Sequence, residues 1–305
     1  MASILSITST MSPQLAARIA YPMFVTPSPR RELRPEERRI MDEARESSVR
    51  VRSSKLNVYE WKKGPDVVLL VHGWQGRASQ FNVLVRSLRA RGFTVVAFDA
   101  PACGASEGTT TDIADYIDAM RKLQRIYGPF AGVVGHSFGA LAALSAVNEG
   151  LQARRVVGVG TIPDAAYLLS SFAERLQLSK ATVNALVERF QFTRSLGDID
   201  IRDRFSGIKN PVNVPTLFVH DQDDSRVPHT ASEQLQAAHG PSSRLLLTRD
   251  YGHSAVLAAG EAIDSIVDFL AENSDVAEQK ATLKPAQIVG QQGLVTEGAE
   301  TPVAR

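Results

Sequence analysis

Short apolar runs alternate with amphipathic stretches through the middle of the chain. Residues 67–71 are continuously apolar, which is typical of a strand buried on both faces of a parallel sheet. Similar runs occur at residues 93–99, 131–136, 155–162, 215–220 and 244–248. Apolar residues recur at helical spacing in the intervals, as at Phe81, Leu84, Val85 and Leu88. This alternation predicts an α/β fold, with a parallel sheet covered by helices on both faces.

Two further patterns extend this picture. The paired runs 48–52 and 55–61 predict a leading antiparallel hairpin, which brings the sheet to about eight strands, mostly parallel. Residues 163–210 lack a strand signal, and their apolar positions suggest two helices. A helical insertion here would lie over the carboxyl ends of the strands, where open α/β folds bind ligands. We interpret it as a small lid; a long crossover of extra helices is the alternative.

The ends of the chain differ from this α/β core, which we place at residues 48–272. Residues 1–47 are expected to form a helical extension, because Leu15, Ile19, Met23 and Phe24 have near-helical spacing. We predict a short helix docked on the domain, with a peripheral membrane anchor as the alternative. Its first eleven residues make a poor signal peptide and are too short to span a membrane. Residues 273–305 lack periodicity and are expected to be a disordered tail.

Composition narrows the class of protein but names no partner. The 305 residues are 44% hydrophobic and 22% charged, which is typical of a soluble globular chain. A net charge of +1 offers no basic stripe for nucleic acid. The single cysteine, Cys103, excludes an intramolecular disulfide and a thiolate metal cage. We therefore expect a cytoplasmic protein with a small-molecule substrate and no metal or organic cofactor, whose oligomeric state the sequence does not reveal.

A serine with the features of a nucleophile follows the apolar run at residues 131–136. The segment Gly135-His136-Ser137-Phe138-Gly139 leads directly into a helix-forming stretch. A serine on a sharp strand-to-helix turn has a strained backbone, so its neighbours two residues away must be nearly free of side chains. This context predicts that Ser137 is exposed for attack rather than part of an ordinary turn.

A serine hydroxyl needs a neutral histidine to take its proton and a carboxylate to orient that histidine. Of six histidines, His253 follows the last predicted strand and precedes the final helix, so it would project over the same sheet edge as Ser137. His239 ends a helix and is expected to be exposed to solvent. His229 is expected to cap a helix or to face water.

The acid is expected in residues 218–228, which leave the penultimate strand and contain three aspartates. Asp224 lies deep enough in this loop to turn back toward the histidine. Asp221 is expected to cap the turn, while Asp223 or Asp224 could each pair with Arg226. Asp164, which follows the preceding strand, is a further candidate. We predict Asp224 as the orienting acid.

At this point the chain resembles the α/β-hydrolase superfamily over roughly residues 50–272. Five pieces occur in the family's order: His72-Gly73, Asp99-x-Pro101-x-x-Gly104-x-Ser106, the turn around Ser137, Asp224 with Val227-Pro228, and Gly252-His253. The resemblance implies that Ser137 is the nucleophile, with Asp224 and His253 as its acid and base. It also implies an oxyanion hole formed by the backbone N–H groups of Phe138 and Trp74.

Departures from related families limit the chemistry. Epoxide hydrolases and haloalkane dehalogenases carry aspartate where this chain has Ser137, so the resemblance argues against both. Residues 73–76 lack the multiple glycines of many lipases, which argues against bulky tertiary-alcohol esters. Gly73, Trp74 and Phe138 are expected to line the substrate pocket, although Trp74 could simply be a hydrophobic plug. Cys103 has no paired base and is expected to be buried filler.

These observations together predict a serine hydrolase that cleaves a small to medium carboxylic ester through an acyl-enzyme on Ser137. Thioesterase, lactonase, C–C-bond hydrolase, perhydrolase and acyltransferase activities use the same three residues and remain open, as does a non-catalytic ligand receptor. The apolar insertion favours an acyl or aromatic substrate over a sugar or a peptide.

Overall fold

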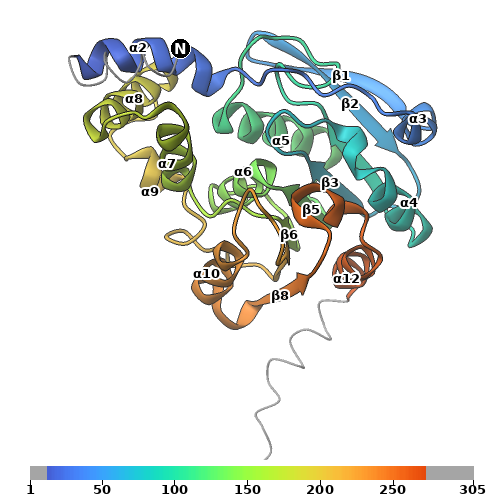
Figure 1. Ribbon diagram of the computed structural model, residues 1–305. Coiled ribbons are helices and arrows are strands. Elements are labelled where there is room, and N and C mark those ends of the chain that lie inside the picture. The colour runs from blue at the N-terminus through green and yellow to red at the C-terminus, as the bar shows by residue number, and fades with distance from the viewer. Residues whose placement is uncertain (1–11, 273–305) are drawn as a thin grey trace, which may run out of the picture. The chain divides into compact units, whose positions relative to one another are not determined.

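The computed structural model describes residues 12–272; the expectations for residues 1–11 and 273–305 lie outside this part. Its centre is one sheet with the strand order β1-β2-β4-β3-β5-β6-β7-β8 (Figure 1). The predicted hairpin is confirmed as β1 (Arg45–Val51) and β2 (Ser54–Trp61), which pair antiparallel. The remaining described strands run parallel to one another: β3 (Val67–Val71), β4 (Thr94–Phe98), β5 (Gly132–His136), β6 (Val156–Val159), β7 (Thr216–Asp221) and β8 (Ser243–Thr248).

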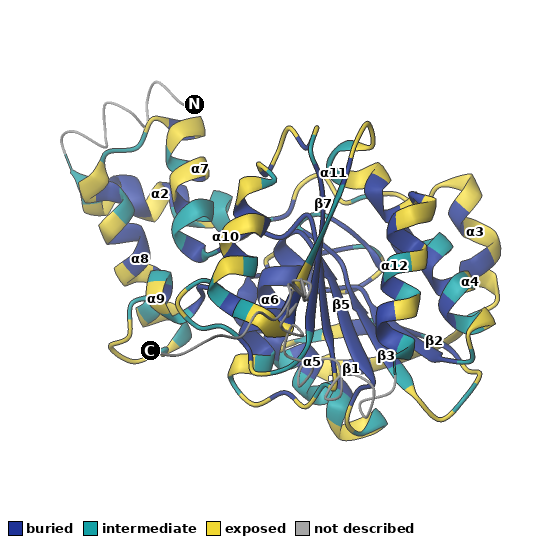
Figure 2. Ribbon diagram, turned by 90° about the horizontal axis from the view of Figure 1, so that it is seen from below, coloured by how far each residue is buried: buried dark blue, intermediate teal, exposed yellow. Residues whose placement is uncertain are grey.

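Helices cover both faces of this sheet, as the alternation of patterns predicts (Figure 2). One face packs against α5 (Ile113–Tyr127), α6 (Phe138–Asn148) and α10 (Thr230–His239). The other packs against α3 (Pro35–Asp42), α4 (Asn82–Ala90) and α12 (Gly260–Ala271). The short helical turns are η1 (Ala78–Phe81), η2 (Gly240–Ser242), α11 (Gly252–Ala255) and η3 (Val256–Ala258). The middle of the sheet is therefore covered by apolar side chains on both faces.

The segment between β6 and β7 is helical, with one helix more than the two expected. It contains α7 (Ala165–Leu176), α8 (Lys180–Arg194) and the single turn α9 (Ile201–Arg204). Apolar side chains on α7 and α8 are buried, including Phe172 and Phe190. These helices enter the same core cluster as α5 and α6, so the insertion packs onto the domain on this side of the sheet.

The predicted N-terminal helix is present as α2 (Pro13–Val25), and it lies beside α8 (Figure 1). Its docked face differs from the apolar stripe noted in the sequence. Ala16, Ala17 and Ala20 are buried, whereas Leu15 and Ile19 are 49% and 43% exposed. Small side chains allow two helix backbones to approach closely, which is consistent with buried alanines in a helix that contacts α8.

The chain between α2 and α3 is held against the core by arginines. The guanidinium of Arg30 donates to the backbone carbonyls of Ser106 at 2.6 Å and Gly108 at 2.5 Å. Glu37 accepts from Arg31 at 2.7 Å and from the hydroxyl of Ser79 at 2.6 Å.

Within residues 12–272, no helix is both long and apolar enough to cross a membrane. Peripheral membrane contact through α2 stays a prediction.

Candidate active site

Ser137 lies on the turn between β5 and α6, in the strained conformation that its sequence context predicts. Its φ is 54° and its ψ is −119°, a region that residues with a side chain rarely occupy. A Cβ atom on Gly135 would overlap the backbone of Ala140, and one on Gly139 would overlap the carbonyl oxygen of Val71. The steric reason for both glycines is thus confirmed, because strand and helix pass one another at these two positions.

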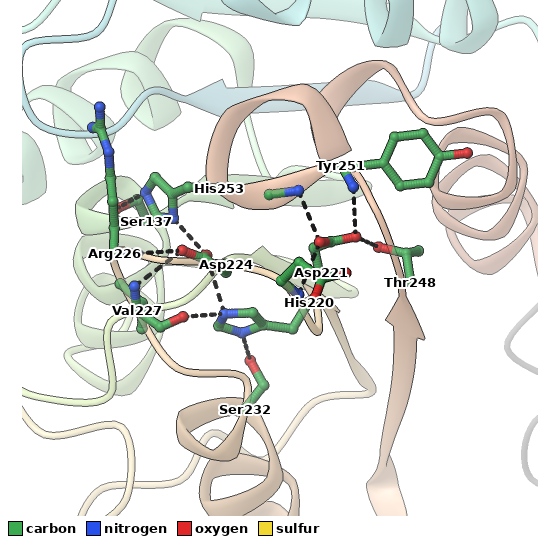
Figure 3. A network of polar contacts seen from close by, with 12 residues as sticks. Ser137, His220, Asp221, Asp224, Arg226, Val227, Ser232, Thr248, Tyr251 and His253 are labelled. Atoms are coloured by element: carbon green, nitrogen blue, oxygen red, sulfur yellow. Dashed lines mark hydrogen bonds and ion pairs between the residues drawn. The ribbon is translucent and has the colours of Figure 1, made fainter.

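The structure brings Ser137, His253 and Asp224 together from three separate segments (Figure 3). The Oγ atom of Ser137 is 3.0 Å from Nε2 of His253, and Nδ1 of His253 is 2.6 Å from Oδ2 of Asp224. His253 lies in α11, just after β8, and Asp224 lies in the loop after β7. In the neutral tautomer that suits these neighbours, Nδ1 donates to the carboxylate and Nε2 accepts from the serine hydroxyl.

The other candidate acids have structural partners instead. Asp221 accepts hydrogen bonds from the hydroxyl of Thr248 at 2.8 Å and from the backbone N–H of Gly252 at 2.8 Å (Figure 3). It therefore fixes the loop that carries His253, besides accepting from a backbone N–H in its own turn. Asp223 accepts from a backbone N–H in the β8–α11 loop. Asp164 caps α7 by accepting from a backbone N–H at 2.7 Å.

Asp224 is surrounded by donors. Its Oδ1 accepts from the backbone N–H groups of Arg226 at 2.8 Å and Val227 at 3.0 Å. Its Oδ2 lies 3.2 Å from Nε2 of His220, in addition to its contact with His253. Burial by itself raises the pKa of Asp224, but the hydrogen bonds from His220 and His253 outweigh it and hold the pKa below its usual value. The carboxylate is therefore ionised at neutral pH.

His220 is a second histidine on this acid, and sequence reasoning gave it no role. It is the last residue but one of β7 and is fully buried. Its Nε2 is also 3.0 Å from the carbonyl of Val227, so this nitrogen faces two acceptors and carries a hydrogen. Its Nδ1 is 2.6 Å from the hydroxyl of Ser232, which donates when the ring is neutral (Figure 3). The only sequence signal was the four-residue spacing between His220 and Asp224.

His136, which precedes the serine, holds the backbone of the candidate base. Its Nε2 donates to the carbonyl oxygen of His253 at 2.9 Å, and its Nδ1 accepts from the amide of Gln80 at 3.1 Å. The two imidazole rings lie 4.9 Å apart. Burial, reinforced by the neighbouring His253, lowers the pKa of His136 to about 3, so the ring stays neutral. Neither contact is readable from the sequence, because the partners are far apart along the chain.

The loop after β3 lies against the serine. Nδ1 of His72 donates to the carbonyl of Gly73 at 2.7 Å, while its Nε2 accepts from the backbone N–H of Ala100 at 2.9 Å. Burial lowers the pKa of His72, which fits this neutral, structural role. A Cβ atom on Gly73 would lie 3.2 Å from Cβ of Ser137. Gly73 thus allows the loop to approach the serine closely.

The aspartate of the second sequence motif is structural too. Asp99 is buried at the end of β4 and accepts from the backbone N–H groups of Ala78 at 2.7 Å and Ala105 at 2.8 Å. A side chain on Gly104 would collide with its carboxylate. Asp99 therefore joins the loops after β3 and β4.

A cavity of about 230 Å³ lies under the insertion, with a mostly apolar lining. The expected pocket residues Trp74 and Phe138 both line it, and their rings meet edge to face at 5.4 Å. Gly73, expected in the same wall, is buried and does not line the cavity; it faces Ser137 and His136 instead. The remaining lining residues are Met23, Phe24, Asp112, Ile113, Ala165, Leu168, Ser171, Phe172, Arg175, Phe190, Ile201 and Phe205.

Three further residues singled out in the sequence are Cys103, His239 and His229. Cys103 is buried, as expected, and burial raises the pKa of its thiol to about 12. The expectation that His239 is exposed was wrong, because its ring packs edge to face on Phe218 and its Nδ1 bonds a carbonyl of its own helix. His229 is partly exposed at the start of α10.

Within residues 12–272, no three His, Cys, Asp or Glu side chains gather in a way that could hold a metal ion.

Comparison with known proteins agrees with this architecture. Lysophosphatidylserine lipase ABHD12 of Danio rerio is 31% identical over 181 residues, which cover 55% of this chain and 46% of that protein. The chain thus spans about half the length of this curated relative.

Solved structures show the same fold. An esterase from Pyrococcus furiosus superposes with a TM-score of 0.59 at 19% identity, covering 81% of this chain and 97% of the other. Mouse alpha/beta hydrolase domain-containing protein 10 gives a TM-score of 0.58 at 17% identity, covering 78% of this chain and 100% of the other. The sequence pattern of the alpha/beta hydrolase family matches residues 68–266, and the chain belongs to that family.

Proposed function

We propose that the protein is a carboxylic-ester hydrolase that works through an acyl-enzyme on Ser137. The observation that carries the proposal is the continuous contact from Ser137 through His253 to Asp224. His253 takes the hydroxyl proton as Oγ attacks the ester carbonyl, then gives it to the leaving alcohol oxygen. Water next attacks the acyl-enzyme while His253 takes its proton, which releases the carboxylic acid and restores the serine.

The oxyanion that forms during attack needs donors on the side away from His253. Phe138 begins α6, where a helix leaves its first N–H groups without intrahelical partners and carries positive potential. Trp74 supplies the second N–H from the loop that Gly73 brings against the serine. Neither N–H has a hydrogen-bond partner among the described residues. Donors in such positions stabilise the charge of the transition state more than the neutral ester.

An apolar acyl group fits the cavity beside these residues better than a sugar or a peptide, because its lining is apolar apart from Asp112, Ser171 and Arg175. The relative ABHD12 is named as a lysophosphatidylserine lipase, and lipases cleave carboxylic esters. We therefore favour an oxygen ester over a thioester, a lactone or a C–C bond. Ser-based acyl transfer to an alcohol other than water is the second candidate.

The decisive experiment compares wild type with Ser137→Ala on p-nitrophenyl esters and with a fluorophosphonate probe. We expect Ser137→Ala to lower kcat/KM by about a thousandfold or more and to abolish labelling, because the nucleophile is lost. Ser145→Ala, on the same helix but outside the cavity lining, is the matched control and should retain both.

Equal ester hydrolysis by wild type and Ser137→Ala would overturn the proposal. Matched thioester and lactone substrates, and an added acceptor alcohol, then separate the alternative reactions. Labelling of Ser137 without turnover on any of them would indicate a binding protein.

A further inference from the structure

The N-terminal helix contributes to the wall of the cavity. Met23 and Phe24 of α2 line it together with Phe172 and Phe190 from the insertion. The part of the chain that matches the alpha/beta hydrolase family begins at residue 68, so α2 lies outside it. This part of the wall is therefore a property of this chain and is not supplied by the family's core.

Several contacts hold α2 in this position. The ring of Phe24 meets that of Phe172 edge to face at 5.1 Å and that of Phe190 at 6.5 Å. The guanidinium of Arg189 lies 5.4 Å from the ring centre of Tyr21. At the end of the helix, the carbonyl of Val25 accepts from a backbone N–H just before α5 at 2.8 Å. The helix is thus attached to both the insertion and the core.

The aromatic residues around the cavity form two groups. Trp74 and Phe138 form one group next to Ser137, and Phe24, Phe172 and Phe190 form the other. Among the described side chains, no ring pair joins the two groups. The cavity lining includes both groups. Ser137 itself is not a lining residue, but Phe138 follows it directly in the chain, whereas Phe24 belongs to α2.

The size of the cavity sets a limit on the acyl chain. An apolar cavity of about 150 Å³ holds benzene, which has six carbons. By the same proportion, 230 Å³ has room for about nine carbons. At the cavity, the carboxylate of Asp112 accepts from a backbone N–H and pairs with Arg194. The guanidinium of Arg175 lies 5.6 Å from the ring centre of Phe172, so the lining offers mainly apolar contacts.

We infer that Phe24 closes the far end of the acyl pocket and so sets the longest acyl chain that the enzyme accepts, with medium-chain fatty acyl esters as the substrate class. The inference rests on the proposed function, because it assumes that the acyl carbonyl is held at Ser137. Phe24 is then a specificity-determining residue contributed by a helix outside the family's core.

The experiment measures kcat/KM for p-nitrophenyl esters from acetyl to tetradecanoyl. Wild type should be most active near octanoyl and decanoyl. Phe24→Ala removes a ring and should raise the ratio of dodecanoyl to octanoyl activity by about tenfold or more, since one methylene in an apolar pocket is worth that factor. Phe24→Trp should shift the optimum to shorter chains. Leu15→Ala, exposed on the same helix, is the control and should keep the wild-type profile.

Two results would overturn the inference: an unchanged chain-length profile in both Phe24 variants, or an equal loss for all chain lengths. Thermal unfolding identifies a variant that fails to fold. In that case the chain-length profiles of the other variant and of Phe24→Leu test the inference. Binding of saturated fatty acids to Ser137→Ala, with and without Phe24→Ala, separates this inference from the proposed function. If wild type cleaves no ester, the proposed function fails; if Phe24→Ala leaves the preferred fatty-acid length unchanged, the inference fails.

Discussion

Asp224 contacts two histidines. Under the proposed function, His220 holds the acid in place while His253 moves a proton. His220 and two backbone N–H groups hold the carboxylate independently of His253. During the proposed reaction His253 becomes positively charged, so the acid beside it must be both ionised and correctly aimed. His220 touches neither the serine nor the cavity, which makes it a positioning residue that acts through Asp224.

Replacing His220 tests this role at the scale of one residue. We expect His220→Leu to lower kcat about a hundredfold with little change in KM, because a misplaced acid no longer orients the base. His220→Gln keeps an N–H donor and should restore most of kcat. The control is His229→Leu, which removes a partly exposed histidine from the next element. If His220→Gln and His220→Leu were equally impaired, the role would be packing rather than positioning.

At the scale of elements, arginines of the insertion form ion pairs with the core: Arg204 pairs with Glu149, and Arg194 pairs with two buried aspartates. Arg194 ends α8, and its guanidinium is 2.5 Å from the carboxylate of Asp112 and 2.8 Å from that of Asp115, both at the start of α5. Burial, together with the neighbouring Asp112, raises the pKa of Asp115 to about 6. Burial also raises the pKa of Asp112, against the opposing effect of Arg194. The arginine therefore offsets the repulsion between two buried carboxylates.

Arg194→Leu should destabilise the protein, and the loss should grow with pH. Without the guanidinium both carboxylates take up protons more readily in the folded state than in the unfolded chain. Protonation removes the loss at pH values below the ordinary pKa of a carboxyl. The loss then grows as pH rises from there to the raised pKa values of the folded state. At pH 8 we expect a decrease of about 3 to 5 kcal/mol in the free energy of unfolding, the usual consequence of an uncompensated buried charge. Denaturant titrations at pH 5 and pH 8 would measure it; a loss independent of pH would contradict this account.

At the scale of the whole molecule, the sheet and its two helical layers seal the interior from water (Figure 2). Cys103 can be used to measure how well solvent is excluded, because it is the chain's single cysteine and only 1% of it is exposed. Its raised pKa leaves almost no thiolate at neutral pH, and the thiolate is the reactive form. Modification of the thiol therefore requires the structure to open.

We expect an alkylating reagent at pH 8 to modify Cys103 at least about a thousandfold more slowly in the native protein than in denaturant. Ester hydrolysis should persist throughout the native incubation, because the proposed nucleophile is a serine. Cys103→Ala serves as the control and should show no modification under either condition. Equal rates in native and denatured protein would show that this part of the core opens readily.

The sequence by itself determined the order of strands and helices along the chain and the position of the turn at Ser137. Such features depend on neighbours along the chain: runs of apolar side chains select buried strands, and a nucleophile turn needs glycine on both sides. The choice of Asp224 and His253 also came from the sequence, through their positions after successive strands. The structure places His253 against Ser137 and Asp224 against His253.

Only the tertiary structure decided which distant groups meet. The contacts of His220 and His136 with the candidate acid and base, the burial of His239, and the place of Phe24 in the cavity wall are fixed by packing between segments far apart in sequence. Residue type and spacing do not encode these contacts, because a buried histidine or an apolar helix face has the same local pattern whichever partner it finds. The reaction type is therefore suggested by local pattern, whereas the shape of the pocket that selects the substrate follows from the packing of the whole chain.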